Sequence, residues 1–148
     1  MGISEDIKSS FKSEFSKAIV NILYTQSWLQ QRHKELFKEY DITIPQFNIL
    51  RILRGQYPNS STVNLLIERM IDKSSNASRI VDRLEEKGLV ERKQCENDRR
   101  AVDVYISESG LALLSKLDVQ VEEMESQLNN FNDEELVLLN NLLDKLRA

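Results

Sequence analysis

The spacing of apolar residues predicts two helices in the first third of the chain. From 5 to 39 apolar side chains recur at steps of three and four with no Gly or Pro, which predicts one long amphipathic helix. Thr43 and Gln46 then form a capping box for a second helix. Pro45 fits the first turn of that helix, and Gly55 is expected to end it. The stripe of so long a first helix requires a partner surface to cover it.

Residues 61–87 are predicted to form two short helices joined by a turn. Each has apolar residues at positions i, i+3, i+4 and i+7, which mark one buried face. These residues are Val63, Leu66, Ile67 and Met70 in the first helix and Ala77, Ile80, Val81 and Leu84 in the second. Asp72 or Ser74 is expected to cap the second helix, and Gly88 to end it. The pair has the outline of a helix-turn-helix.

Beyond Gly88 the apolar period changes from 3.6 to 2, which predicts β-structure. Residues 102–106 alternate apolar and polar side chains, LVERKQC is expected to be the partner strand, and ENDRR the tip of the hairpin. Two further helices follow, capped by Ser107 and by Asn132 with Glu135. The expected fold class is mainly α with a small β-hairpin. A helix-turn-helix followed at once by a hairpin is the winged-helix plan.

The net charge of −4 is unevenly distributed, which bears on the partners that the chain can bind. Residues 108–148 hold 3 Lys and Arg against 9 Asp and Glu, a net of −6, and residues 1–107 hold 17 against 15, a net of +2. A local basic surface upstream of the acidic segment therefore stays open. With 148 residues, 41% of them hydrophobic, the chain can form one domain with a real core.

Composition also disfavours several classes of protein. No apolar run approaches the roughly 18 residues of a membrane span, and the charged first residues do not have the pattern of a secretory signal. A single cysteine allows no internal disulfide, so a cytoplasmic location is expected. One His and one Cys cannot supply an N/S-type zinc site, and no nucleophile–base pair or Gly-rich phosphate loop stands out. We therefore expect no catalytic residues, metal, cofactor or membrane contact.

The second helix of the pair carries side chains suited to the edges of DNA bases. The candidate DNA-binding residues in and before its first turns are Lys73, Ser74, Ser75, Asn76, Ser78 and Arg79. In helix-turn-helix proteins this part meets the bases, where Asn can pair bidentately with adenine and Arg with guanine. Phosphates would repel the later Asp82, Glu85 and Glu86, so only the first two turns are expected to enter a groove. The alternative is a solvated helix face of mixed charge.

The hairpin tip adds Asp98, Arg99 and Arg100 as candidate DNA-binding residues. A wing tip touches the DNA backbone and the narrow minor groove, where the charge and planar fork of Arg are favoured. Asp98 can hold one guanidinium in a fixed direction and so lower the entropy lost on binding. The alternative is an ordinary solvated turn, since Asn-Asp is common turn chemistry. The occurrence of helix pair, hairpin and tip in one register favours DNA binding.

Residues 72–110, DKSSNASRIVDRLEEKGLVERKQCENDRRAVDVYISESG, resemble the core of the MarR family of bacterial transcriptional regulators. The family pattern is S/T-x-x-S/T-R-x-x-D-x-L-E-x-K-G-L-V-x-R, followed by an Asp-x-Arg wing tip. Asp98 and Arg100 fill the wing motif, and Ser107 stands where the family usually has Thr. The flanking helices match in order and length, so the resemblance covers essentially the whole chain.

The resemblance implies a homodimer that binds a palindromic operator in double-stranded DNA. It assigns residues 1–40 to an N-terminal dimerisation helix, 41–107 to a winged helix-turn-helix DNA-binding domain and 108–148 to C-terminal dimerisation helices. Members usually repress their targets and let go when a small ligand or an oxidant acts. A small aromatic or lipophilic effector would meet Tyr24, Trp28, His33 and Tyr40. The alternative for these aromatic residues is core or dimer packing, and for His33 also a solvated surface position.

Two interpretations of Cys95 stay open, a reactive thiol and a passive residue. Redox-sensing members carry a reactive Cys near the start of the chain, and this sequence has none there. Cys95 follows Arg92 and Lys93 in the first strand of the wing, where nearby positive charge would lower the pKa of an exposed thiol. The alternative is a passive strand residue.

The expected function is that of a sequence-specific DNA-binding transcription regulator, a repressor released by a small-molecule effector, and not an enzyme. Two alternatives remain. One is a winged-helix dimer that acts as a protein–protein adaptor without specific DNA binding. The other is a protein that sequesters a ligand and has no DNA function. Weak binding to generic DNA, unaffected by Arg100→Ala, would favour the adaptor.

Overall fold

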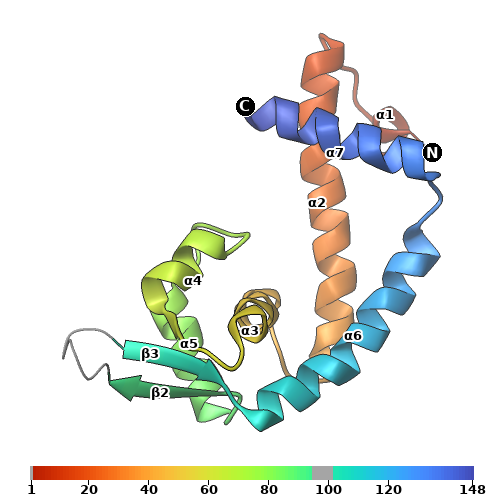
Figure 1. The fold of residues 1–148 in the computed structure, drawn as a ribbon. Helices are drawn as coiled ribbons and strands as arrows, with labels where there is room; N and C mark the ends of the chain where they lie inside the picture. The colour runs from red at the N-terminus through yellow and green to blue at the C-terminus, as the bar shows by residue number, and fades with distance from the viewer. Residues whose placement is uncertain (1, 95–101) are drawn as a thin grey trace. The chain divides into compact units, whose positions relative to one another are not determined.

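The computed structural model describes residues 2–94 and 102–148, drawn as a ribbon in Figure 1. One compact unit ends at Ser115, and a second runs from Lys116 to Ala148. The first unit contains helices α1 (Ile3–Asp6), α2 (Glu14–Lys38), α3 (Ile44–Gln56), α4 (Val63–Arg69) and α5 (Ala77–Glu86) and strands β1 (Ser61–Thr62), β2 (Val90–Gln94) and β3 (Val102–Ile106). Helix α6 (Glu108–Leu128) begins in the first unit and continues into the second, which ends with α7 (Asp133–Arg147).

The sheet confirms the predicted hairpin and adds one short strand. Strands β2 and β3 are antiparallel, with Val90 opposite Ile106 and Gln94 opposite Val102. On its other edge β3 pairs with β1, where Ser61 lies opposite Val104. A strand of two residues has no hydrophobic period, so the sequence pattern could not reveal it. The mainly helical fold with a small antiparallel sheet is confirmed.

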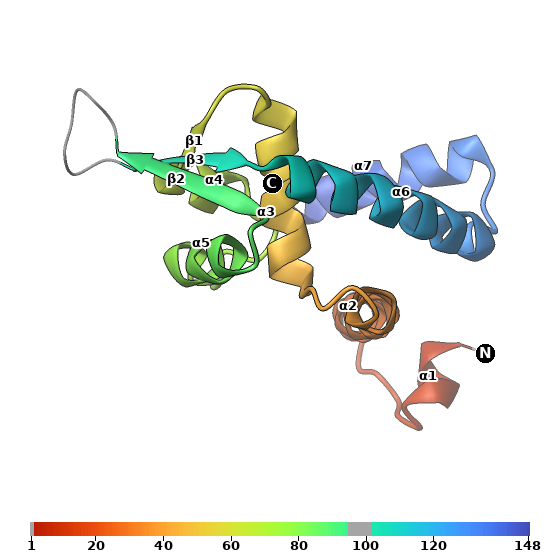
Figure 2. The same cartoon turned by 90° about the horizontal axis from the view of Figure 1, so that it is seen from below.

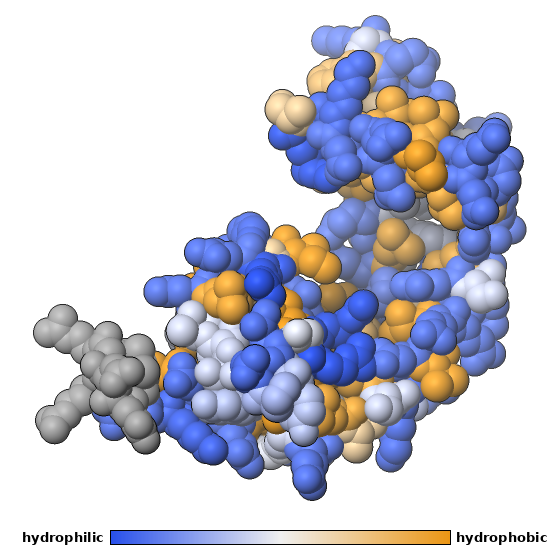
Figure 3. All heavy atoms as spheres, in the orientation of Figure 1, coloured by the Kyte–Doolittle hydropathy of each residue, from blue (hydrophilic) through white to orange (hydrophobic). Residues whose placement is uncertain are grey.

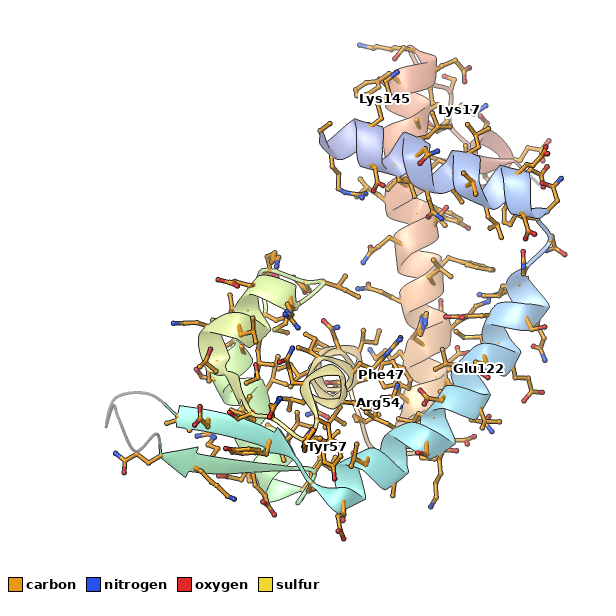
Figure 4. All side chains as sticks on the ribbon, in the orientation of Figure 1. Lys17, Phe47, Arg54, Tyr57, Glu122 and Lys145 are labelled. Carbon is orange, nitrogen blue, oxygen red and sulfur yellow. The ribbon has the colours of Figure 1, made fainter. Side chains whose placement is uncertain are left out.

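Helix α3 is the central element of the first unit, because it contacts α2, α4, α5 and β3. Its inner face buries Ile49, Leu50 and Leu53 almost completely. The ring of Phe47, labelled in Figure 4, lies 4.5 Å from that of Phe37, measured between centroids, and joins the start of α3 to the last turn of α2. Helix α5 packs on β2, as Figure 2 shows from below, and thus completes a three-helix, one-sheet core.

The prediction of one helix from 5 to 39 is wrong, because the structure has two. Helix α1 ends at Asp6, and α2 begins at Glu14 after Ser13, whose hydroxyl accepts a 3.0 Å hydrogen bond from the backbone N–H of Ser16. Between them Lys8 has a left-handed φ of 51°. Serines compete with the helix for backbone partners and favour caps. Apolar spacing continued across this break, so it concealed the end of one helix and the start of the next.

The predicted helix boundaries are partly confirmed. The capping box of Thr43 and Gln46 is present, and so is the one formed by Asn132 with its third residue Glu135. Gly88, at a φ of 72°, follows the C-cap residue Lys87 and stands at the end of α5 as expected. Gly55 does not end α3, which continues to Gln56.

None of the helices within residues 2–94 and 102–148 combines the length and apolar character that a membrane span requires.

The start of α6 is packed tightly against the end of the sheet. The Ser107 hydroxyl accepts from the N–H of Gly110 at 3.0 Å, which confirms Ser107 as the cap, and donates to the carbonyl of Gly88 at 2.7 Å. A Cβ on Gly110 would lie 2.4 Å from the carbonyl oxygen of Leu89 and 2.7 Å from a side-chain carbon of Ile106. Only glycine therefore allows this approach of helix to backbone.

We expect Gly110→Ala to lower the free energy of unfolding by about 1–3 kcal/mol, since a backbone carbonyl cannot move aside cheaply. Gly55→Ala is the matched control, because its Cβ would meet nothing within 4 Å. In the last turn of α3 that change should stabilise the protein by at most about 0.5–1 kcal/mol, the value for a helix interior. Chemical denaturation of both variants measures the difference, and equal effects would contradict the tight junction.

Candidate nucleic-acid interface

Helix α5 presents one buried face and one exposed polar face. Ala77, Val81 and Leu84 are at most 2% exposed and pack toward α3, α4 and β2. The opposite face carries Ser78, Arg79, Asp82, Arg83, Glu85 and Glu86, all exposed. The predicted division of the helix into two faces is therefore present, and packing of one face determines which side chains can reach a ligand.

The turn before α5 is held by internal hydrogen bonds. The backbone N–H of Ile71 donates to the Oδ1 of Asn48 at 3.0 Å. The Nζ of Lys73 donates to the carbonyl of Ile67 at 3.1 Å and to that of Glu68. A cation at this place caps the last carbonyls of α4 and interacts favourably with its dipole. Lys73 was expected to bind DNA, and in the free protein its ammonium group is engaged in this cap.

Asp72 and Ser74 stabilise the same turn and do not cap α5. The carboxylate of Asp72 accepts from the backbone N–H of Ser74 at 2.9 Å and from its hydroxyl at 2.6 Å. These bonds, with a smaller one from Ser75, hold the pKa of Asp72 below its ordinary value of 3.8. The expectation of a cap at 72 or 74 is wrong because an Asx turn uses these residues before the helix starts.

The N-cap of α5 is Asn76, which limits what its side chain can offer to DNA. Its Oδ1 accepts from the backbone N–H of Arg79 at 3.1 Å. A bidentate contact with adenine requires both the oxygen and the nitrogen of the amide. With one lone pair of the oxygen engaged in the cap, Asn76 is less free to turn both amide atoms toward one adenine, and its Nδ2 donors are the groups that remain fully available.

Arg79 differs from the other arginines near it. Arg83 pairs with Glu86 at 3.1 Å, and Arg92 of β2 pairs with Asp82. Among the residues that the structure describes, no hydrogen bond or ion pair engages the Arg79 side chain. Its guanidinium is therefore available for a bidentate contact. The two ion pairs also neutralise Asp82 and Glu86, the acidic groups that would repel phosphate.

The wing is described as far as its two strands. Lys93 of β2 has its Nζ 5.1 Å from the ring centroid of Tyr105 on β3, a cation–π contact. The candidate residues Asp98, Arg99 and Arg100, and the thiol of Cys95, lie outside the described residues.

The predicted effector residues lie on successive turns of α2 and just after it. Tyr24 and Trp28 are exposed, and the guanidinium carbon of Arg32 is 3.4 Å from the Trp28 ring centroid. His33 and Tyr40 are half-buried. The Nδ1 of His33 is 2.9 Å from the carbonyl of Leu29, which lies one turn earlier. In residues 2–94 and 102–148, no group of three His, Cys, Asp or Glu could hold a metal ion.

The residues that connect the α5 segment to α3 could not be recognised from local sequence patterns. Asn48 and Ile71 are 23 positions apart, and Lys87 donates to Gln46, 41 positions earlier. Gln46 could be recognised only as half of a capping box. Pairs so distant along the chain leave no periodic signal.

Helix pair, hairpin and exposed α5 together define a winged helix-turn-helix. Residues 42–102 match the model of the MarR family. The regulator PecS of Dickeya dadantii is 28% identical over 114 residues, 76% of this chain and 69% of PecS. The MarR transcription factor from Planctomyces limnophilus is 29% identical, with a TM-score of 0.70 over 91% of this chain and 98% of that one.

The same fold occurs in a protein solved on DNA. The Staphylococcus aureus MepR–DNA complex has a TM-score of 0.80 over 87% of this chain and 94% of MepR, at 22% identity, which shows the fold alone. The predicted resemblance to the MarR family is confirmed by the match of residues 42–102 to the family model. The chain is thus in the class of DNA-binding transcription regulators, and its relatives are regulators and not enzymes.

We expect Ser74→Ala to raise the pKa of Asp72 toward 3.8, because it removes the hydroxyl that donates to the carboxylate. Because the pKa of Asp72 is depressed by folding, the carboxylate contributes its stability at pH values above its pKa in the unfolded chain. That stability is lost as pH falls through its pKa in the folded protein. An NMR titration of the carboxyl carbon gives both pKa values. Ser78→Ala, one turn later, is the control. An unchanged pKa of Asp72 in Ser74→Ala would show that the hydrogen bond from Ser74 does not cause the shift.

Proposed function

We propose that this protein binds a palindromic operator in double-stranded DNA as a homodimer and represses transcription until a small aromatic effector releases it. The observation that carries this proposal is that Arg79, on the exposed first turns of α5, has no side-chain partner among residues 2–94 and 102–148. Such a position in a helix-turn-helix meets base edges in the major groove. A regulator of this kind acts where the chromosome is, so the proposal includes a cytoplasmic location.

The roles proposed for the other candidate residues follow from their free groups. Ser75 and Ser78 are near the start of α5. The hydroxyl of Ser74 donates its hydrogen bond to Asp72, and its oxygen lone pairs can still accept one. Lys73 and Asn76 are assigned a contact with DNA in addition to their capping bonds: Lys73 near a phosphate, and Asn76 through its amide NH2 group. Asp98, Arg99 and Arg100 are proposed to contact the backbone or the minor groove.

We expect Arg79→Ala to cost roughly 1–3 kcal/mol of binding free energy and to relax the preference at one base pair in each half-site. Arg79→Lys keeps the charge but loses the planar fork, so the preference should relax in the same way. Arg83→Ala is the matched control, since Arg83 is already paired with Glu86. Arg100→Ala should weaken binding evenly across sequences.

The decisive measurement is selection of bound sequences from a random duplex pool at two salt concentrations, with each variant in parallel. Enrichment of a palindrome with half-sites about one helical turn apart supports a dimer that binds a specific DNA sequence. Retention that is only salt-sensitive and unchanged by Arg79→Ala and Arg100→Ala would favour the protein–protein adaptor and defeat the proposal.

The proposed homodimer would cover apolar side chains that each unit leaves in solvent. In α2 Phe15 is 66% and Leu23 62% exposed, and in α7 Val137 and Leu142 are more than half exposed. Apolar residues at the surface are orange in Figure 3. Contiguous exposed apolar residues mark interaction sites. This supports residues 1–40 and 108–148 as dimerisation segments.

We expect Leu142→Asp to raise the dimer dissociation constant by more than about tenfold, because a carboxylate would be buried in the interface. Asn140→Asp adds the same charge at a polar position of α7 and should leave the dimer intact. Sedimentation velocity over a concentration series measures both. A Leu142→Asp protein that stays folded and dimeric at every concentration would exclude α7 from the interface.

The proposed effector site includes Tyr24 and Trp28, two exposed aromatic rings one turn apart on α2. The nearby Arg32 guanidinium offers a positive charge beside an aromatic face, which suits an aromatic acid. His33 and Tyr40 add polar groups farther along the chain. An effector that binds here would act on the segment that leads into α3.

A further inference from the structure

Both ends of the segment that contains α5 are tied to the beginning of α3. At the N-terminal side the Oδ1 of Asn48 accepts from the backbone N–H of Ile71 at 3.0 Å. At the C-terminal side the Nζ of Lys87, the C-cap residue of α5, donates to the Oε1 of Gln46 at 3.2 Å. Gln46 and Asn48 are two residues apart. A single turn of α3 therefore contacts the chain before and after the recognition helix.

The anchor at Gln46 is itself fixed in place. Its side chain is 7% exposed, and the same Oε1 accepts from the backbone N–H of Thr43 at 3.1 Å as part of the capping box. Lys87 also donates to the backbone carbonyl of Asp41 and has its Nζ 3.8 Å from the carboxylate. Asp41 lies in the connector between α2 and α3 at a left-handed φ of 51°. The ammonium group thus joins the end of α5 to a backbone with little freedom.

Apolar packing alone leaves the direction of α5 less well defined. Its buried face consists of Ala77, Val81 and Leu84, three side chains along one stripe of a ten-residue helix. Such a stripe defines which face is inward but resists a small rotation or tilt weakly. A directional hydrogen bond at Lys87, directly after α5, and another at Ile71, in the turn that leads into it, add the missing constraint. Base contacts depend on that direction, whereas phosphate contacts depend on it much less.

We infer that Gln46 and Asn48 are positioning residues for sequence readout, and that Lys87 is the link between Gln46 and the recognition helix. None of them is assigned to touch a base. The inference rests on the proposed function, since it concerns how α5 is aimed at DNA. It predicts that loss of an anchor lowers affinity for the operator but spares affinity for unrelated DNA.

The test uses Asn48→Ala, which removes the acceptor, and Asn48→Asp, which keeps it. We expect Asn48→Ala to reduce the ratio of operator affinity to random-duplex affinity about three- to tenfold, the range for one hydrogen bond. Asn48→Asp should retain the ratio. Hydrogen exchange of the Ile71 amide should quicken in Asn48→Ala alone. Thermal unfolding of each variant confirms that the protein compared is folded.

Lys87→Met gives an independent test at a side chain that is 30% exposed, with Lys87→Arg as the conservative variant. We expect Lys87→Met to lower the same ratio about three- to tenfold, with an unchanged salt slope on random DNA. If its random-duplex affinity falls equally and the salt slope decreases by about one, Lys87 contacts a phosphate and the anchor is refuted. The inference is likewise overturned if Asn48→Ala loses equal affinity for the operator and for random duplex, or if Asn48→Asp does not retain the wild-type ratio of the two affinities.

Loss of specific DNA recognition and loss of the positioning role give different experimental results. If the unmodified protein selects no sequence, the proposed DNA readout is wrong and the inference is overturned with it. If it selects an operator that Arg79→Ala relaxes, while both anchor variants keep the wild-type ratio, DNA readout stands and only the positioning role is overturned.

Discussion

Burial of one face of α5 is the constraint on which the rest of the domain depends. Ala77, Val81 and Leu84 are withdrawn from water, and each large aliphatic side chain contributes about 1.5–3 kcal/mol when fully buried. Because the helix repeats every 3.6 residues, the same packing exposes Arg79 on the opposite side. Strand β2 of the hairpin packs against one side of α5, and α3 packs against another. The candidate interface is thus a by-product of how the core closes.

Polar side chains around α5 serve the backbone first and a ligand second. Lys73, Asp72 and Asn76 each use hydrogen-bonding groups to stabilise a helix end or the turn between helices. In sequence they resemble free donors and acceptors because residue type alone does not reveal prior engagement. The result is a rigid platform with few uncommitted groups. Rigidity of this kind lowers the entropy that a binding partner must remove.

Local patterns sufficed for most of the fold and for part of the site. Capping boxes, the hairpin and the two faces of α5 follow from spacing within about ten residues, and these predictions are confirmed. The break between α1 and α2 was missed because apolar spacing continues across it. The end of α3 was placed one residue too early because glycine is tolerated in the last turn of a packed helix. The link from Asn48 to Ile71 spans 23 positions, so only the folded chain reveals it. The wing-tip assignment, at Asp98 and its neighbours, stays a prediction.

The occupied oxygen of Asn76 has a consequence for the variety of promoters that such a regulator could serve. Asn distinguishes adenine by a bidentate contact that uses both its oxygen and its nitrogen. A side chain held by its capping bond is less free to make that contact, so a base pair beside it would be discriminated weakly. Operators could drift at that position without losing the protein, while a position read by the guanidinium of Arg79 would stay fixed. One capping hydrogen bond would in this way broaden the regulon.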